Sequence, residues 1–256
     1  MHSLIRRTLV LLLLLTSAAS PAELHVVSSG GFAAALKTLA PIYEQKTGDK
    51  LVLAWGPSMG NTQDTVPARL QRAEDIDVVI MVGYALNDLV KTGAVVGASR
   101  KDLARSGIGV VVRQGTPHPD ISTVAALKAT LLAAKSIAYS DSASGVYISS
   151  QLFRSLGIAD QVAGKAKMIP AEPVGAVVAR GDAELGFQQI SELKPIKGID
   201  LVGPLPPEVQ QYTVFAAALV TRSDQPDDAR ALLQFLASPQ AAPAIADSGM
   251  EPLPPR

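Results

Sequence analysis

The chain has 256 residues, no cysteine, 4% aromatic residues and equal numbers of acidic and basic side chains, 23 of each. Without cysteine, disulfides, metal–thiolate sites and a cysteine nucleophile are excluded. Balanced charge is not typical of nucleic-acid-binding proteins, and few aromatic residues argue against sugar-stacking clefts. We therefore expect no nucleic-acid partner.

Residues 1–22 have the pattern of a secretory signal peptide. Arg6 and Arg7 form a basic start, Leu9–Leu15 is an apolar run, and Ser20-Pro21-Ala22 is a small-residue cleavage site. The apolar run is much shorter than the roughly 20 residues that span a bilayer, so cleavage near Ala22 is predicted, with a retained anchor as the alternative. The rest of the chain is expected in the periplasm.

From residue 23 onward, short β-rich runs alternate with segments that have helical spacing of apolar residues. The predicted strands are Glu23–Val27, Lys50–Trp55, Asp77–Val82, Ile108–Arg113, Lys135–Tyr139, Ala166–Ile169, Leu185–Gln188, Gly198–Val202 and Tyr212–Val220. The predicted helices are Phe32–Lys46, Ala85–Lys91, Val124–Ala133, Val146–Leu156, Val174–Arg180, Pro226–Leu236 and Pro239–Asp247. One further helix is either begun or kinked by Pro67. This alternation predicts an α/β fold with parallel sheets.

Three of the predicted strands end in loops rich in serine, glycine and other small residues. The loops are Ser28–Phe32, Gly56–Asn61 and Asp141–Tyr147. In α/β proteins, ligands bind outside the carboxyl ends of the strands, and free N–H groups at a helix start favour an anion. Each loop alone is also compatible with ordinary turn chemistry. Together, the three loops predict one small anionic ligand at their meeting point.

No sequence motif indicates a metal site or a serine hydrolase. The chain contains no HExxH, no paired Cys/His spacing and no acidic metal cluster, and Ser144-Gly145 lacks the flanks of a nucleophile elbow. We expect no metal and no cofactor.

The signal peptide, strand–SSGG–helix, strand–GPSMGN–helix and the run IDVVIMV together make the chain similar to the periplasmic molybdate-binding proteins. These are type 2 solute-binding proteins of ABC importers, and the resemblance covers nearly the whole mature chain. It implies two α/β lobes, each a mostly parallel sheet flanked by helices, with the ligand in the interlobe cleft. Lobe one would comprise residues 23–103 plus 212–256, and lobe two residues 104–211.

The same resemblance implies positions for the ligand-holding groups. The family's first anion-holding serine falls at or beside Gly31 and its second at Ser58. A backbone donor falls near Ala143 and Ser144, and another at Val174. The family's tyrosine falls at Gln189, which departs from the molybdate pattern.

The candidate ligand shell suits a small polycarboxylate better than molybdate. The predicted ligand-binding residues are Ser28, Ser29, Gly30, Gly31, Ser58, Met59, Asn61, Arg105, Ser142, Ser144, Val174, Gln188 and Gln189. This set contains amides and one guanidinium, and an arginine can bind a planar carboxylate through two hydrogen bonds. The predicted ligand is therefore a small polycarboxylate or another carboxylate, with a molybdate-like oxyanion as the alternative.

Within this superfamily, the chain resembles the bacterial aconitate isomerase branch in size, export signal and loop chemistry. That resemblance implies interconversion of cis- and trans-aconitate by a 1,3-allylic proton shift. The reaction needs an acid–base group and donors that hold the developing enolate. Glu172 and Tyr147 are the candidate catalytic residues, with a solvated loop acid and a packed ring as the respective alternatives.

Two further functions remain open from the sequence. One is a non-catalytic solute-binding component of an ABC importer, for which an ABC permease would be the partner. The other is a binding module that hands its ligand to a sensor kinase. In each case a monomer is expected.

Overall fold

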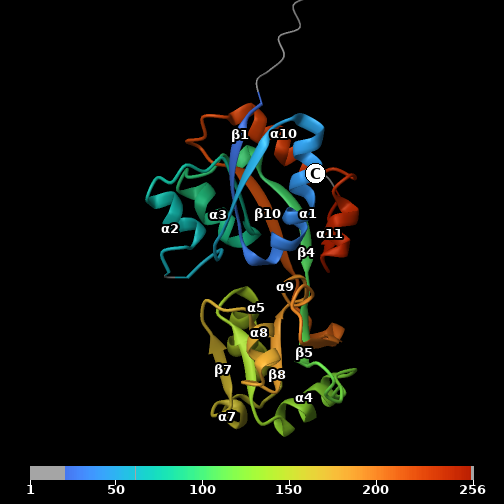
Figure 1. Cartoon of the computed structure of the whole chain (residues 1–256). Coiled ribbons are helices and arrows are strands. Elements are labelled where there is room, and N and C mark those ends of the chain that lie inside the picture. Colours follow the sequence, from blue (N-terminus) through green and yellow to red (C-terminus); the bar gives the residue numbers. More distant parts are fainter. Residues whose placement is uncertain (1–20, 61, 255–256) are drawn as a thin grey trace, which may run out of the picture.

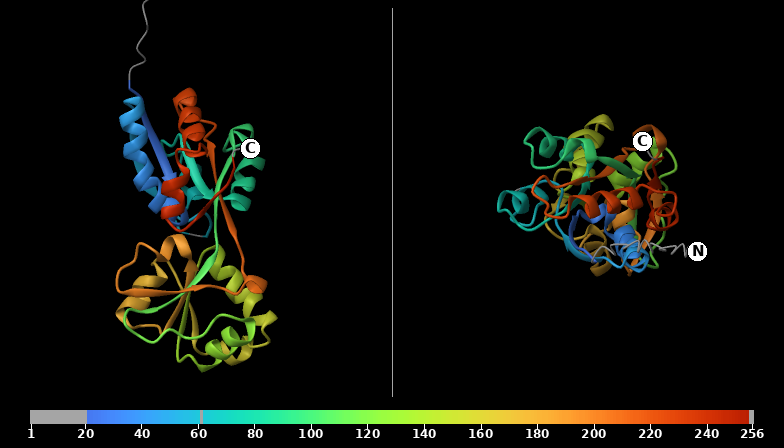
Figure 2. Two further views of the ribbon diagram at one scale, coloured as in Figure 1. Left: turned by 90° about the vertical axis from the view of Figure 1, so that its right-hand side faces the viewer. Right: turned by 90° about the horizontal axis from the view of Figure 1, so that it is seen from above.

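The computed structural model describes residues 21–60 and 62–254. The predicted signal peptide up to residue 20, and Asn61, lie outside the described residues. Two lobes lie one above the other, joined by two stretches of chain (Figure 1, Figure 2). In the described ranges, no helix has both the length and the apolar character needed to cross a membrane.

The strands are β1 Glu23–Ser28, β2 Lys50–Trp55, β3 Val78–Val82, β4 Lys101–Ser106, β5 Ile108–Arg113, β6 Ile137–Ser140, β7 Ala166–Ile169, β8 Leu185–Gln189, β9 Ile199–Pro204, β10 Thr213–Leu219 and β11 Glu251–Pro252. The α-helices are α1 Gly30–Thr47, α2 Val66–Gln71, α3 Gly83–Lys91, α4 Val124–Ala133, α5 Ala143–Tyr147, α6 Phe153–Ser155, α7 Ala159–Val162, α8 Val174–Arg180, α9 Ile190–Leu193, α10 Pro226–Leu236 and α11 Ala242–Asp247. The short 3₁₀ helices are η1 Gly97–Ser99 and η3 Pro207–Val209, and a π-helical turn, η2 Ile148–Leu152, joins α5 to α6.

Each lobe contains one sheet flanked by helices, which confirms the predicted two-lobed α/β fold (Figure 2). The six-stranded sheet has the order β11-β4-β10-β3-β1-β2, and the five-stranded sheet the order β7-β6-β8-β5-β9. β1 runs parallel to β2 and β3, and β6 parallel to β7 and β8. The other pairings are antiparallel, so the sheets are less parallel than expected. The reason is that β5 and β10 enter their sheets from the opposite lobe, without a crossover helix.

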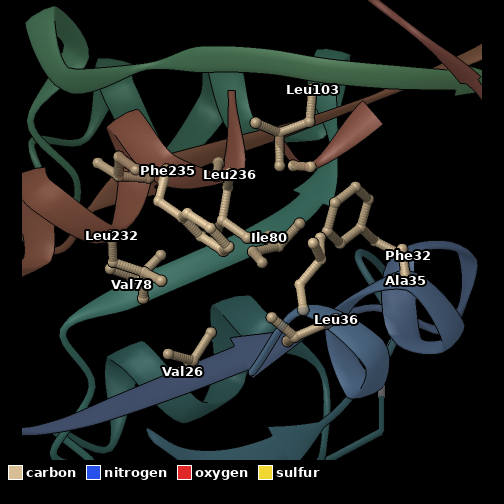
Figure 3. Packing of buried hydrophobic residues seen from close by; sticks show 14 of the residues in the cluster. Val26, Phe32, Ala35, Leu36, Val78, Ile80, Leu103, Leu232, Phe235 and Leu236 are labelled. Atoms are coloured by element: carbon tan, nitrogen blue, oxygen red, sulfur yellow. The ribbon is translucent and has the colours of Figure 1, made fainter. Parts of the chain in front are cut away.

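The start of α1 is held in place by the lobe-one core (Figure 3). Phe32 and Leu36 of α1 are fully buried in the same cluster as Val26 and Ile80 of the sheet and Leu232 of α10. Burial of such side chains contributes about 1.5–3 kcal/mol each. Because Phe32 directly follows the SSGG loop, this packing fixes where that loop faces the second lobe.

Side-chain amides connect the two stretches of chain that join the lobes. The Gln210 amide accepts a hydrogen bond from the Ile108 N–H at 2.8 Å and donates one to the Ile108 carbonyl at 3.0 Å. Gln189 Nε2 donates to Thr213 Oγ1 at 2.8 Å. The predicted change of lobe after residue 103 falls within β4, and the division at 103/104 and 211/212 stays a prediction.

Several elements differ from the sequence-based expectation, and the structure decides the open alternative for Pro67. β4 was not predicted, because its sequence KDLARS lacks a clear strand period and its neighbours in the sheet make it a strand. α5 begins at Ala143 rather than Val146, so Ser144 lies inside the helix. Pro67 lies in the first turn of α2, where the missing N–H removes no helical hydrogen bond, and it therefore begins that helix.

Candidate functional site

A cavity of about 440 Å³, here called the interlobe cavity, lies between the two sheets. On the side of the six-stranded sheet it is lined by Ser29, Gly30, Gly31, Trp55, Gly56, Pro57, Ser58, Thr62, Asp64, Val82 and Phe215. On the other side it is lined by Asp141, Ser142, Ala143, Ala171, Glu172, Pro173, Gln188, Gln189 and Glu192. Parts of all three small-residue loops reach it.

On the lobe-one side, the ends of β1 and β2 bring two serines to the cavity. Ser29 caps α1 in an extended conformation and makes no side-chain capping bond. It is 4% exposed, and its Oγ has no hydrogen-bond partner in the part of the chain that the structure describes. Ser58 Oγ accepts from the Val82 N–H at 2.9 Å, which leaves its own proton to donate. A buried unpaired hydroxyl is costly, so we expect a ligand group to supply the missing hydrogen-bond partner of Ser29 Oγ.

On the lobe-two side, three serine hydroxyls form a chain at the start of α5. Ser140 Oγ lies 3.0 Å from Ser142 Oγ and 2.9 Å from Ser144 Oγ. Gly145 packs so closely on the Ser140 carbonyl that an added Cβ would collide with it. Glycine at this position therefore allows the helix to start directly at the end of β6.

Two glutamines follow each other at the end of β8 and point to different partners. Gln188 Oε1 accepts from the Val174 N–H at 2.9 Å, so this predicted backbone donor is already satisfied within the protein. Gln189 donates to Thr213 and is 2% exposed. Its Oε1 has no hydrogen-bond partner among residues 21–60 and 62–254. Gln189 thus offers an acceptor for a ligand group that carries a proton.

The charge of the cavity wall is one-sided. Of the described lining residues, Asp64, Asp141, Glu172 and Glu192 are acidic and none is basic. Asp141 Oδ2 accepts a hydrogen bond from the Ala171 N–H at 3.1 Å. An anionic ligand in this cavity must therefore be held by N–H groups and hydroxyls rather than by a cation.

Glu172 is ionised and paired. Its carboxylate receives two hydrogen bonds from the Arg180 guanidinium, of which the one from Nη2 to Oε2 measures 3.2 Å. The bond from Arg180 holds the pKa of Glu172 below its ordinary value. The side chain is 40% exposed. These properties stabilise the charged form and make Glu172 a weak base.

Glu192 is in the opposite situation. It is partly buried at the start of α9, and desolvation, the largest cause, raises its pKa to about 7. The charge of Asp141 raises the pKa further, whereas a hydrogen bond with Gln188 lowers it. Glu192 is thus the lining carboxyl whose proton can be both gained and lost near neutral pH.

Six of the predicted site residues do not line the interlobe cavity: Ser28, Met59, Arg105, Ser144, Tyr147 and Val174. Asn61 lies outside the described residues. Ser28 is fully buried and donates to the Ser29 carbonyl at 3.1 Å. Met59 lines a separate hollow beside α2 and α3.

Arg105 and Tyr147 have partners elsewhere. The pairing of β4 with β11 places Arg105 opposite Glu251, and its Nη2 lies 2.6 Å from Glu251 Oε2. The same guanidinium lies 4.4 Å from the centre of the Tyr212 ring. The Tyr147 hydroxyl donates to the Val209 carbonyl at 2.7 Å, and burial raises the pKa of Tyr147. Neither side chain is brought to the cavity.

Some lining residues were not predicted, notably Glu192, Asp141 and the rings of Trp55 and Phe215. Asp141 lies in the loop Asp141–Tyr147, in which Ser142 and Ser144 are the predicted ligand-binding residues. Glu192 follows the predicted strand Leu185–Gln188 by a few residues. Its place after the carboxyl end of a parallel strand was the signal that could have identified it.

The sequence is similar to those of known solute-binding proteins and of an isomerase. Residues 24–251 match the family of bacterial extracellular solute-binding proteins. The chain is 55% identical to the aconitate isomerase of a Pseudomonas species over 231 residues, which covers 90% of this chain and 88% of that protein. It is 27% identical to the molybdate-binding protein ModA of Azotobacter vinelandii, with 91% of each chain covered.

Solved structures show the same fold. The periplasmic molybdate-binding protein of Azotobacter vinelandii matches with a TM-score of 0.72 at 20% identity, covering 90% of this chain and 99% of that chain. The substrate-binding domain of a putative molybdenum ABC transporter from Clostridium difficile matches with a TM-score of 0.70 at 18% identity, covering 91% and 99%. Both resemblances inferred from the sequence are confirmed. The chain belongs to the family of bacterial extracellular solute-binding proteins.

Proposed function

We propose that this protein is an exported aconitate isomerase that interconverts cis- and trans-aconitate. The observation that carries the proposal is the 55% identity to the Pseudomonas aconitate isomerase over 90% of the chain. Export to the periplasm and a monomeric state belong to the same proposal.

The size and donors of the interlobe cavity support a small organic anion as the ligand. Its volume of about 440 Å³ lies within the range of about 300–1,000 Å³ that is usual for such ligands. The first turn of the 18-residue helix α1 begins at Gly30 and Gly31, which line the cavity. Their N–H groups and the hydroxyls of Ser29 and Ser58 would hold ligand carboxylates, with the helix dipole favouring negative charge.

The proposed reaction is a 1,3-allylic proton shift. A base removes a proton from the methylene carbon, the double bond moves by one carbon, and a proton is returned to the former vinylic carbon. Charge that develops on the adjacent carboxylate is stabilised by hydrogen-bond donors already in place. One proton leaves and one returns, so the reaction is balanced without an oxidant or reductant.

A second candidate function is passive binding of a small anion for an ABC importer. The 27% identity to the Azotobacter vinelandii ModA protein favours it, because that protein is named for molybdate binding. An ABC permease would be a partner only in this case. Apart from Ser29, Gly30, Gly31 and Ser58, the residues of the predicted ligand shell stay predictions for either function.

One assay separates the two functions. The purified mature protein is incubated with cis-aconitate, without added metal or nucleotide, and the trans isomer is followed by chromatography. Turnover supports the isomerase. No turnover, combined with tight molybdate binding in calorimetry, would overturn the isomerase in favour of the importer component.

A further inference from the structure

We propose that Glu192 is the catalytic residue that carries the proton, removing it from one carbon of the ligand and returning it to the other. This inference rests on the function proposed above and names the acid–base group of the same site. Glu192 was not among the residues that the sequence singled out.

The position of Glu192 is set by contacts from both lobes. It lies on α9, which directly follows β8 and is drawn where the two lobes meet (Figure 1). Glu192 lines the interlobe cavity together with Gln188 and Gln189. Its carboxyl group packs on Gly30, the first residue of α1 in the opposite lobe. A Cβ at residue 30 would collide with Glu192 Oε1 and lie 3.5 Å from its Cδ. The carboxyl therefore occupies the space that a side chain at position 30 would need.

The surroundings of Glu192 keep its proton exchangeable. Among the ion pairs of the described residues, none involves Glu192. Asp141, which lines the same lobe-two side of the cavity, is the ionisable group that acts on it; β8 contributes the neutral Gln188, and α1 the uncharged Gly30. Lys194, which caps the end of α9, has its Cδ beside Gly249. Burial and a like charge thus act together and raise the pKa of Glu192 to about 7.

These conditions match what an allylic proton shift requires. A group whose pKa lies near the working pH can accept a proton and donate it again within one cycle. Bound carboxylates would raise the pKa of Glu192 further, because like charges disfavour its ionised form, and would make it a stronger base. The charge that forms on the ligand would appear next to the start of α1 and the unpaired Ser29 hydroxyl.

The other carboxyl groups of the cavity are less suited to this role. Glu172 is paired with Arg180, and Asp141 accepts the Ala171 N–H. Asp64 lies beside Arg69, with 3.7 Å between its Oδ1 and the Arg69 Nη2. Arg180 favours the charged form of Glu172 and weakens it as a base, whereas the oxygens of Asp141 and Asp64 are engaged by a backbone N–H and by a guanidinium.

The test compares Glu192→Gln with Glu208→Gln, the same change on an exposed residue of η3 outside the cavity. Turnover of cis-aconitate and exchange of its methylene hydrogens with D₂O are measured, and binding of trans-aconitate is followed by calorimetry. Glu192→Gln is expected to lose at least about a hundredfold in kcat and in exchange, while binding changes only a few-fold. Glu208→Gln is expected to match the wild-type protein. More than a tenth of wild-type turnover in Glu192→Gln would overturn the assignment.

A second variant covers the case in which Glu192→Gln does not fold. Gly30→Ala keeps the carboxylate but pushes it out of its place, and the helical position accepts alanine. It is expected to lower kcat at least about tenfold with trans-aconitate still bound, since misplacement of a reacting group is costly. Unchanged kcat in Gly30→Ala would overturn the assignment. A wild-type protein without any turnover would overturn the proposed function instead, so the two failures are distinguishable.

Discussion

Glu172 and Glu192 line the same cavity from the same lobe, yet their surroundings push their pKa values in opposite directions. At Glu172 an exposed guanidinium favours the charged form, and at Glu192 burial and a like charge favour the neutral form. Pairs of carboxyl groups with separated pKa values are how active sites assign acid and base roles. Exposure and neighbours, rather than residue type, therefore decide which glutamate can move a proton.

The largest expected effect that tests this comparison is on stability. Because the folded-state pKa of Glu192 is about 7 against an ordinary value of 4.5, the folded protein binds more protons than the unfolded chain between these pH values. The free energy of unfolding should therefore fall as the pH rises through this window. Glu192→Gln should remove up to about 3 kcal/mol of that fall, measured by urea unfolding at pH 4.5 and 8. Equal pH dependence of mutant and wild type would contradict the environment described for Glu192.

The next prediction concerns Ser29, a neutral donor on the lobe-one wall of the cavity, opposite the two glutamates. Ser29→Ala should weaken aconitate binding by about tenfold to hundredfold, because a hydrogen bond to a charged group contributes about 1.5–3 kcal/mol. The unliganded protein should be at least as stable as the wild type, since the lost hydroxyl is buried and has no partner within the described protein. Calorimetry and thermal unfolding measure the two effects. Ser155→Ala, on α6 away from the cavity, is the control, and normal affinity in Ser29→Ala would remove this serine from the site.

A smaller change, in the pH dependence of turnover, should follow from removing the charge of Asp141 that acts on Glu192. The proton-abstracting form of Glu192 is ionised, so kcat/KM for cis-aconitate should rise with pH through about 7 and then level off. Asp141→Asn keeps an acceptor for the Ala171 N–H but removes the charge that raises the pKa of Glu192. The rise in kcat/KM should move to lower pH, as measured in a pH series. A shift to higher pH, or none, would show that another group controls the profile.

The smallest effect is expected at Glu172. Glu172→Gln should lower kcat/KM less than about tenfold, because exposed ion pairs contribute little and the pairing with Arg180 already weakens this carboxylate as a base. Steady-state assays beside Glu192→Gln make the comparison direct. If Glu172→Gln lost as much turnover as Glu192→Gln, the sequence-based prediction that Glu172 is a catalytic residue would be favoured.

Much of the fold could be predicted because hydrophobic periodicity is a local property. Lys50–Trp55, Ile108–Arg113, Val124–Ala133, Ala166–Ile169 and Val174–Arg180 were predicted with the bounds that the structure shows. β4 was missed because its residues form a strand only beside β10 and β11. The antiparallel pairings also depend on how the chain passes between lobes, which no local pattern records.

The candidate site was also predictable only where it depends on residues close together in the sequence. Serines and glycines at strand ends were recognisable because parallel strands place their carboxyl ends together, and Ser29, Gly30, Gly31 and Ser58 do line the cavity. Arg105 is predicted from the sequence as a ligand-binding guanidinium, but its partner Glu251 is 146 residues away in the sequence. No spacing rule could reveal that pair.

By itself, the sequence determined the alternation of strands and helices, the family and the three loops that face the cavity, because these depend on residues close together in the chain. Only the tertiary structure decided which acidic side chain is desolvated. Glu192 stands in a short polar stretch, and its pKa is raised because α9 packs on Gly30 of α1 and because the charge of Asp141 acts on it from the same side of the cavity. Desolvation depends on all atoms around a group, and those atoms come from distant parts of the chain.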